Sequence, residues 1–172
     1  MPDSQPDPPV LATVPYNSTT KSPDRYLVGL SLKRAQHELR LAINAELASL
    51  ETNISQVSVM REISLNPGVS SVDLARLVWL TPQTLGQIVI QMQERGLVER
   101  RPGKGRRISH YLTSQGESLL VAGMDKAREV DALALRDFSD EELTTLFDGF
   151  RAIERRAREA RARGRISGPT IA

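Results

Sequence analysis

Apolar residues recur at helical spacing along most of the chain, and they follow strand spacing in one short stretch. Residues 23–52 carry apolar side chains on one face of a predicted helix. Similar patterns predict five more helices, which begin near residues 53, 70, 81, 113 and 139. Residues 97–101 and 108–112 instead predict two short strands joined by the turn Pro102-Gly103-Lys104-Gly105. The pattern therefore predicts a mainly α fold of six helices with a small two-stranded β hairpin.

Residues that cap helices stand at five of these starts: Asn53, Ser70, Thr81, Thr113 and Ser139. Asn53 with Gln56 is typical of a capping box, in which each side chain bonds the other residue's backbone N–H. Pro82 follows Thr81 at the first helical position, where its missing N–H costs nothing. We expect the third helix to pack Val72, Leu74, Ala75 and Leu77 or Val78 inward. The corresponding stripe of the fourth helix is Leu85, Ile88 or Val89, and Met92.

Two short helices, a tight turn and a basic hairpin, in this order, indicate a winged helix-turn-helix. The outward face of the fourth helix carries neutral polar side chains that can read base edges in a major groove: Thr81, Gln83, Thr84, Gln87 and Gln91. The helix starts at Ser70 and Thr81 offer free N–H groups to phosphates. Lys104, Arg106 and Arg107 at the hairpin suit a narrow minor groove.

Composition excludes several other classes of protein. The sequence contains no cysteine, so disulfides, cysteine-ligated zinc and thiol redox sensing are ruled out. The net charge is only +2, but six of the residues from 95 to 107 are basic and one is acidic. A basic cluster is the usual electrostatic mark of nucleic-acid binding, although basic runs are also common on solvated faces, so charge alone does not identify the partner. We find no catalytic constellation, metal site or cofactor site. We also find no signal peptide and no apolar run of about 18 residues, so we expect a cytoplasmic protein without membrane contact.

The stretch PGVSSVDLARLVWLTPQTLGQIVIQMQERGLVERR, followed by LTSQG, resembles the multiple-antibiotic-resistance regulator (MarR) family. The resemblance runs from about Asp24 to Arg163. It implies an intertwined homodimer, with residues 23–52 and 113–163 as dimerisation helices and residues 53–112 as the DNA-binding lobe. It also implies a regulator, usually a repressor, of a pseudo-palindromic operator in double-stranded DNA, released by a small and often aromatic ligand. Residues 1–22 are expected to form a disordered tail and residues 164–172 a second tail.

By position in this family, Ser70 and Thr81 would hold phosphates, Gln83, Thr84 and Gln87 would face bases, and Arg106 would be the wing arginine. Ser71 and Pro82 complete the expected contact set. His37, Arg40, Met60 and Trp79 are candidates for an effector pocket. Three departures from the family pattern concern this surface: Gly86 replaces a common serine, Gln87 replaces a frequent arginine, and Lys104-Gly105 replaces an aspartate that often orients the wing arginine.

Two other functions remain open from the sequence. The same fold occurs in architectural proteins that bind DNA without sequence preference. Winged helices also serve as protein-interaction modules, since a fold does not determine a function. An affinity that depends on DNA sequence would distinguish a regulator from an architectural protein. Any DNA binding at low salt would distinguish it from a protein-interaction module.

Overall fold

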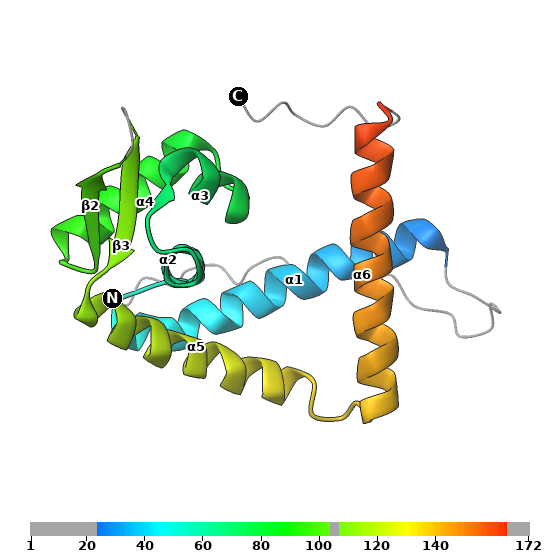
Figure 1. Cartoon of the computed structure of the whole chain (residues 1–172). Coiled ribbons are helices and arrows are strands. Elements are labelled where there is room, and N and C mark those ends of the chain that lie inside the picture. Colours follow the sequence, from blue (N-terminus) through cyan, green and yellow to red (C-terminus); the bar gives the residue numbers. More distant parts are fainter. Residues whose placement is uncertain (1–23, 104–106, 165–172) are drawn as a thin grey trace, which may run out of the picture. The chain divides into compact units, whose positions relative to one another are not determined.

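The computed structural model describes residues 24–103 and 107–164 of the chain. The tails expected at residues 1–22 and 164–172 lie outside this range except for Gly164, as do Lys104 and Arg106. The chain divides into two compact units, residues 1–36 and 37–172, and the first helix contributes to both. The described residues are mainly helical and contain six α-helices, as expected (Figure 1). The elements are α1 (Arg25–Leu47), a 3₁₀ turn (Ala48–Leu50), α2 (Ile54–Leu65), β1 (Val69–Ser70), α3 (Ser71–Leu77), α4 (Pro82–Glu94), β2 (Val98–Pro102), β3 (Ile108–Leu112), α5 (Ser114–Ala134) and α6 (Asp140–Ala162).

All five predicted capping residues cap their helices. In each case the side chain accepts a hydrogen bond from the backbone N–H three residues later, which satisfies one of the donors that a helix start leaves free. Ser139 and Glu142 form a complete capping box at the start of α6. The helix boundaries therefore follow from local hydrogen bonds that the sequence encodes.

The capping box predicted for Asn53 and Gln56 is only half present. Asn53 accepts from the Gln56 backbone N–H at 3.0 Å, but the Gln56 side chain is buried and makes other bonds. Its Oε1 accepts from Thr52 Oγ1 at 2.8 Å and from Arg95 Nη1 at 3.4 Å. Arg95 also donates to the Glu51 carbonyl at 2.6 Å. The amide turns inward because the end of α4 supplies a charged donor there, which local sequence spacing does not indicate.

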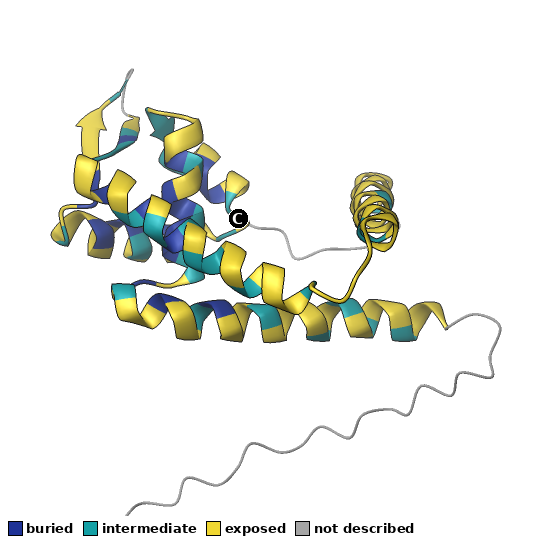
Figure 2. Cartoon of the chain, turned by 90° about the horizontal axis from the view of Figure 1, so that it is seen from below, coloured by how far each residue is buried: buried dark blue, intermediate teal, exposed yellow. Residues whose placement is uncertain are grey.

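The main core lies among α2, α3, α4, the start of α5 and the end of α1 (Figure 2). Leu85, Val89 and Met92 form the predicted inward stripe of α4. The prediction for α3 is correct for Leu74 and Ala75 but wrong for Val72, which is 56% exposed. With seven residues, α3 makes two turns, and the side chains that reach the core come from one side of those turns.

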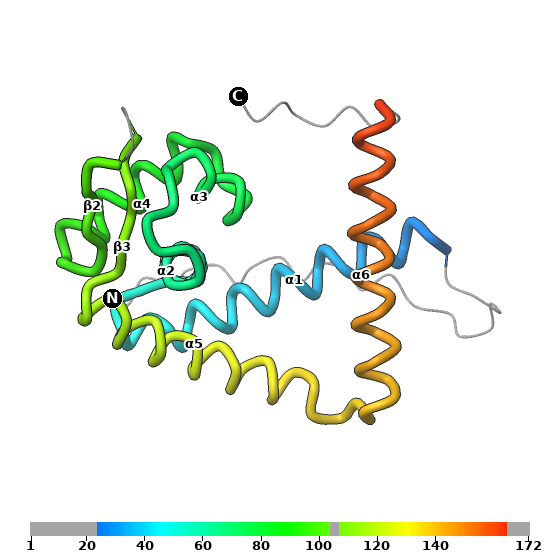
Figure 3. Tube along the Cα trace, viewed as in Figure 1, coloured from blue at the N-terminus to red at the C-terminus, as the bar shows by residue number. Residues whose placement is uncertain are grey.

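The sheet has three strands in the order β1-β3-β2, where the sequence predicted two. The predicted hairpin is present, with Val98 opposite Leu112 and Pro102 opposite Ile108. The additional strand, β1, is two residues long and pairs Val69 with His110. Figure 3 traces how the chain passes from α2 into α3 and α4 before it returns through β2 and β3. A two-residue strand has no alternation to detect, so only its pairing with β3 defines it.

His110 is a buried polar side chain at the centre of this sheet. It lies on β3 between Val69 of β1 and Arg100 of β2, and it is 1% exposed. The ring Nδ1 lies 3.0 Å from the Val69 carbonyl oxygen. Because a carbonyl oxygen only accepts, the Nδ1–H group donates this hydrogen bond. Burial lowers the pKa of His110 below its ordinary value, the Val69 bond partly opposes this shift, and the charge of Arg100 adds to it.

We expect the free energy of unfolding to fall as the pH drops below 6.5, the ordinary pKa of histidine. The unfolded chain takes up a proton at His110 in this range, whereas the folded chain resists it, so the stability present above the ordinary pKa is lost toward lower pH. Urea unfolding followed by circular dichroism at about pH 7.5 and about pH 5.5 measures the effect. His110→Gln should reduce the pH dependence. His37→Gln, at an exposed position on α1, is the matched control and should preserve it; equal dependence in both variants would contradict the assignment.

Candidate nucleic-acid interface

Helix α4 presents an apolar face to the core and a polar face to solvent. Leu85, Val89 and Met92 are buried on one side. The polar side chains predicted to read bases are all exposed: Gln83, Thr84, Gln87 and Gln91. Neutral amides both donate and accept hydrogen bonds, and a glutamine can bond adenine through two atoms in the major groove. One described helix therefore brings the predicted base-reading residues together.

The start of α4 is held by a small hydroxyl network. Thr81 Oγ1 accepts from the Thr84 backbone N–H at 3.2 Å, and it lies 2.9 Å from Thr84 Oγ1. Pro82 occupies the first turn, as predicted. This network limits the rotamers of both threonines, and the positive end of the helix dipole at this start favours an approaching anion. Thr81 and Thr84 are therefore oriented before any contact with DNA.

The start of α3 borders a groove of about 400 Å³. Its lining residues are Ser70, Ser71, Val72, Asp73, Arg76, Arg107 and Ile108. Ser70 Oγ donates to Asp73 Oδ2 at 2.6 Å, and Arg76 Nη1 lies 3.4 Å from Asp73 Oδ1. Arg76 thus offsets the carboxylate charge, and Arg107 adds a cation from the hairpin. The groove combines three predicted residues, Ser70, Ser71 and Arg107, with Arg76 and Asp73, whose place in it was not predicted.

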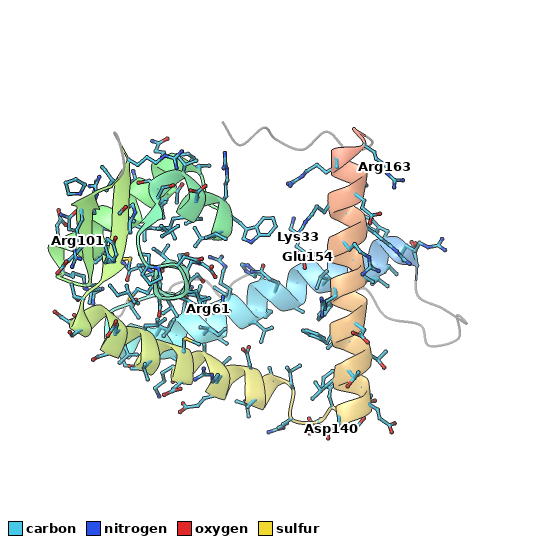
Figure 4. The ribbon with its side chains drawn as sticks, in the orientation of Figure 1. Lys33, Arg61, Arg101, Asp140, Glu154 and Arg163 are labelled. Carbon is cyan, nitrogen blue, oxygen red and sulfur yellow. The ribbon has the colours of Figure 1, made fainter. Side chains whose placement is uncertain are left out.

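Arg101 lies on strand β2 of the hairpin (Figure 4) and contacts two other side chains of the same hairpin. Its Nε and Nη2 both donate to Glu99 Oε2, at 3.0 and 2.6 Å. Its guanidinium lies 4.6 Å from the centroid of the Tyr111 ring, a distance typical of a cation–π contact. This arginine was not predicted from the sequence, although strand alternation places residues 99, 101 and 111 on one face. Of the three hairpin cations that were predicted, Arg107 is described, and Lys104 and Arg106 lie outside the described residues.

Ile90 is a further residue of this surface that was not predicted from the sequence. It lies on α4 and is 48% exposed, although its neighbours Ile88 and Val89 are half-buried and buried. The signal that could have found it is its spacing, because residue 90 is three positions after Gln87 and seven after Gln83. These three residues share one side of the helix.

The four candidates for an effector pocket have different environments. Met60 is fully buried in the core, whereas His37 and Arg40 are exposed on α1. Trp79 is 66% exposed and has a left-handed backbone with φ of 58°, which is a strained conformation for a bulky residue. The indole lines a groove of about 300 Å³ with residues of α6: Glu154, Ala157, Arg158 and Arg161. Among the described residues, Trp79 is therefore the candidate that lines a groove, and arginines of α6 line it too.

Two features are absent from the described part of the chain. It has no helix that is both long and apolar enough to cross a membrane. Within the same residues, no group of three or more histidine and acidic side chains is placed to hold a metal ion.

Comparisons with known proteins give one consistent result. The MarR family profile matches residues 51–108. The transcriptional regulator HosA of Escherichia coli is 33% identical over 116 residues, which cover 63% of this chain and 86% of HosA. The transcriptional repressor Rv2887 of Mycobacterium tuberculosis is 30% identical over 110 residues, which cover 63% of this chain and 79% of Rv2887. The names of both relatives describe transcriptional regulators, and neither describes an enzyme.

Solved structures share the fold. A MarR-family transcriptional regulator from Rhodococcus superposes with a TM-score of 0.70 at 21% identity, over 77% of this chain and 96% of that chain. Rv2887 has been solved with DNA, with a TM-score of 0.62 at 24% identity over 73% of this chain and 96% of that chain. It has also been solved with salicylic acid, with a TM-score of 0.61 at 26% identity over 73% and 95%. On its winged helix-turn-helix lobe and its identity to HosA, the chain belongs to the MarR family.

Proposed function

We propose that this protein is a transcriptional regulator, acting as a repressor, that recognises an operator sequence in double-stranded DNA. The observation that carries this proposal is the exposed face of α4, where Gln83, Thr84 and Gln87 lie opposite the buried stripe. A helix with this face fits the major groove and can read base edges there. Rv2887, the relative that is 30% identical, is named a repressor and has been solved with DNA, which supports the same partner for this chain.

In this proposal the residues around α4 bind the phosphate backbone. Arg107 supplies charge, and Ser70, Ser71 and Thr81 at the starts of α3 and α4 supply N–H and hydroxyl groups. Pro82, which has no N–H, would touch the backbone only through its ring. Such contacts set the register of the protein on the duplex but carry no sequence information. Arg101, Lys104 and Arg106 extend the cationic surface along the hairpin. The division of labour is therefore base reading by α4 and phosphate binding around it.

Two substitutions separate these roles. Gln87→Ala should lose about 1–3 kcal/mol of discrimination at one base pair, because it removes a base contact. Arg107→Ala should weaken binding to every duplex evenly and reduce the slope of log affinity against log salt by about 0.9 for each phosphate that the variant no longer neutralises. Fluorescence anisotropy with the DNA upstream of the coding sequence and with a scrambled duplex, over a KCl series, measures both. Gln93→Ala, exposed at the other end of α4, is the matched control.

The same titrations test the alternatives. Equal affinity for the upstream and scrambled duplexes would contradict recognition of this operator and favour an architectural DNA-binding protein. No binding to either duplex at low salt would favour a protein-interaction module. Equal losses on every duplex for Gln87→Ala and Arg107→Ala would contradict the division of labour.

We further propose that the protein acts as a homodimer. Helix α6 has an apolar stripe with the spacing of one helix face, and none of its residues is buried. The stripe consists of Leu143, Leu146, Phe147, Phe150 and Ile153, of which Phe147 is 60% exposed and Phe150 42%. An apolar patch of this kind marks an interaction surface. Two copies related by a two-fold axis would cover it and would match a pseudo-palindromic operator.

Sedimentation velocity tests the dimer. We expect the wild-type chain to sediment at twice the 19.0 kDa mass of one chain. Phe147→Glu with Phe150→Glu should shift the population toward monomer, because two charges would enter the apolar contact. Asp148→Ala, on the opposite face of α6, should leave the dimer intact. A wild-type chain that sediments as a monomer at micromolar concentration would contradict the proposal.

We propose a small aromatic acid as the effector, with Trp79 as one of its contacts. The groove beside Trp79 offers an indole face for an aromatic ring and two arginines for a carboxylate. Arg158 is already paired with Glu154 at 2.5 Å, so Arg161 is the candidate partner for the ligand. The salicylic acid complex of Rv2887 supports this ligand class. Release from DNA requires that the ligand bind the DNA-bound and free forms with different affinity.

The single tryptophan gives a direct readout of this contact. We expect salicylate to shift the one indole N–H signal in a nitrogen–proton correlation spectrum, and uncharged salicylamide to shift it much less. Arg161→Ala should weaken salicylate binding, whereas Arg40→Ala should not. If Arg40→Ala weakened salicylate binding and Arg161→Ala did not, the ligand would instead bind near the other sequence candidates, His37, Arg40 and Met60. No shift of the signal at millimolar salicylate would exclude Trp79 as a contact.

A further inference from the structure

Ile90 is an apolar side chain on the face of α4 that otherwise carries amides. It is 48% exposed. Residues 83, 87 and 90 are separated by four and three positions, so they lie almost in line along the helix over about 10 Å. The residues that bury α4 against the core are Leu85, Val89 and Met92, on the other side. Ile90 therefore belongs to the surface that faces DNA in the proposed function.

The fold itself gains little from an isoleucine at this position. A β-branched side chain is less favourable in a helix than alanine or a straight-chain residue, because the helix restricts its χ1 rotamers. At a buried site, packing offsets this cost, but half of Ile90 is exposed. The chain also has Gly86 one turn earlier, where an added Cβ would meet nothing within 4 Å. The flank of Ile90 toward Gly86 is thus open to a partner.

The major groove offers one apolar group on its base edges, the methyl group of thymine. Alanine, the threonine methyl and phenylalanine are the side chains that typically contact it, and the exposed part of an isoleucine has the same apolar character. Ile90 lies three residues, about 4.5 Å, beyond Gln87 along α4. Successive base pairs are about 3.4 Å apart. If Gln87 bonds an adenine, Ile90 therefore lies beside the neighbouring base pair.

We propose that Ile90 is a specificity residue that contacts a thymine methyl group in each half of the operator, next to the base pair bonded by Gln87. This assignment rests on the proposed function, because it requires α4 in the major groove of a specific site. It adds an apolar contact to a surface that otherwise uses hydrogen bonds. Sequence preference at this position then depends on a methyl group, and removing the methyl from the DNA should have the same effect as removing the side chain.

The experiment compares a loss on the DNA with a loss on the protein. An operator is first recovered by repeated selection from a library of random duplexes with the wild-type chain. Each thymine of this operator is then replaced in turn by deoxyuridine, which lacks only the methyl group. Affinities are measured by anisotropy for the wild type, for Ile90→Ala and for Gln93→Ala, with circular dichroism as a check that each variant is folded.

We expect one pair of symmetry-related thymines at which deoxyuridine weakens wild-type binding about fourfold for each half-site, the value of one buried methylene-sized group. Ile90→Ala should bind the thymine operator more weakly and should not distinguish thymine from deoxyuridine at that pair. Gln93→Ala should behave as the wild type. Wild-type binding that is insensitive to every deoxyuridine, or sensitivity that persists in Ile90→Ala, would overturn the assignment while leaving the proposed function intact. If the selection enriched no sequence, the proposed function itself would fail, and the assignment with it.

Discussion

The burial of one face of α4 is the constraint on which the candidate interface depends. Leu85, Val89 and Met92 lie in the core among α2, α3 and the sheet. Because helix positions one turn apart share a face, fixing these three residues inside also determines which residues face outward. The amides have no alternative orientation as long as the apolar stripe remains packed. The packing that stabilises the core therefore also sets the orientation of the polar face of α4.

A polar junction around the buried Gln56 side chain also helps to hold the far end of α4 in place. Arg95 donates both to the Glu51 carbonyl and to the Gln56 side chain, which Thr52 bonds as well. Hydrogen bonds from a charged donor are stronger than neutral ones, and leaving such groups unpaired in the interior is costly. The junction connects the end of α4 to the segment between α1 and α2. A movement of that segment would therefore change the bonds that hold the end of α4.

The chain has two kinds of exposed apolar residue, and they have different consequences. The stripe of α6 is continuous, and a continuous apolar surface favours a large partner of the same kind. Ile90 is single and lies among polar groups, and Trp79 is exposed on a strained backbone beside arginines. Isolated side chains of this type suit small apolar targets, such as a base methyl group or a ligand ring. The surroundings of each exposed apolar residue, rather than its exposed area, therefore distinguish a dimer contact from a contact with DNA or a ligand.

The order and approximate limits of the six helices and the hairpin could be predicted from the sequence, because they depend on interactions within a few residues. Caps such as Thr81 and Ser139 bond N–H groups three positions away, and the period of apolar residues separates helix from strand. The polar face of α4, and hence most of the candidate DNA contacts, follows from the same local pattern. The resemblance of the stretch from Pro67 to Arg101 to the MarR family then predicted how these elements combine into a fold.

Other features depend on residues far apart in the chain, and they are visible only in the folded structure. Strand β1 exists through its pairing with β3, Gln56 turns inward to meet Arg95, and burial among the surrounding elements lowers the pKa of His110. Val72 is exposed because α3 packs on the core through Leu74 and Ala75, and Ile90 is exposed because Val89 and Met92 take the core side of α4. Each outcome is a competition among distant groups for a limited interior. Local spacing cannot resolve such a competition, since the competitors meet only when the chain has folded.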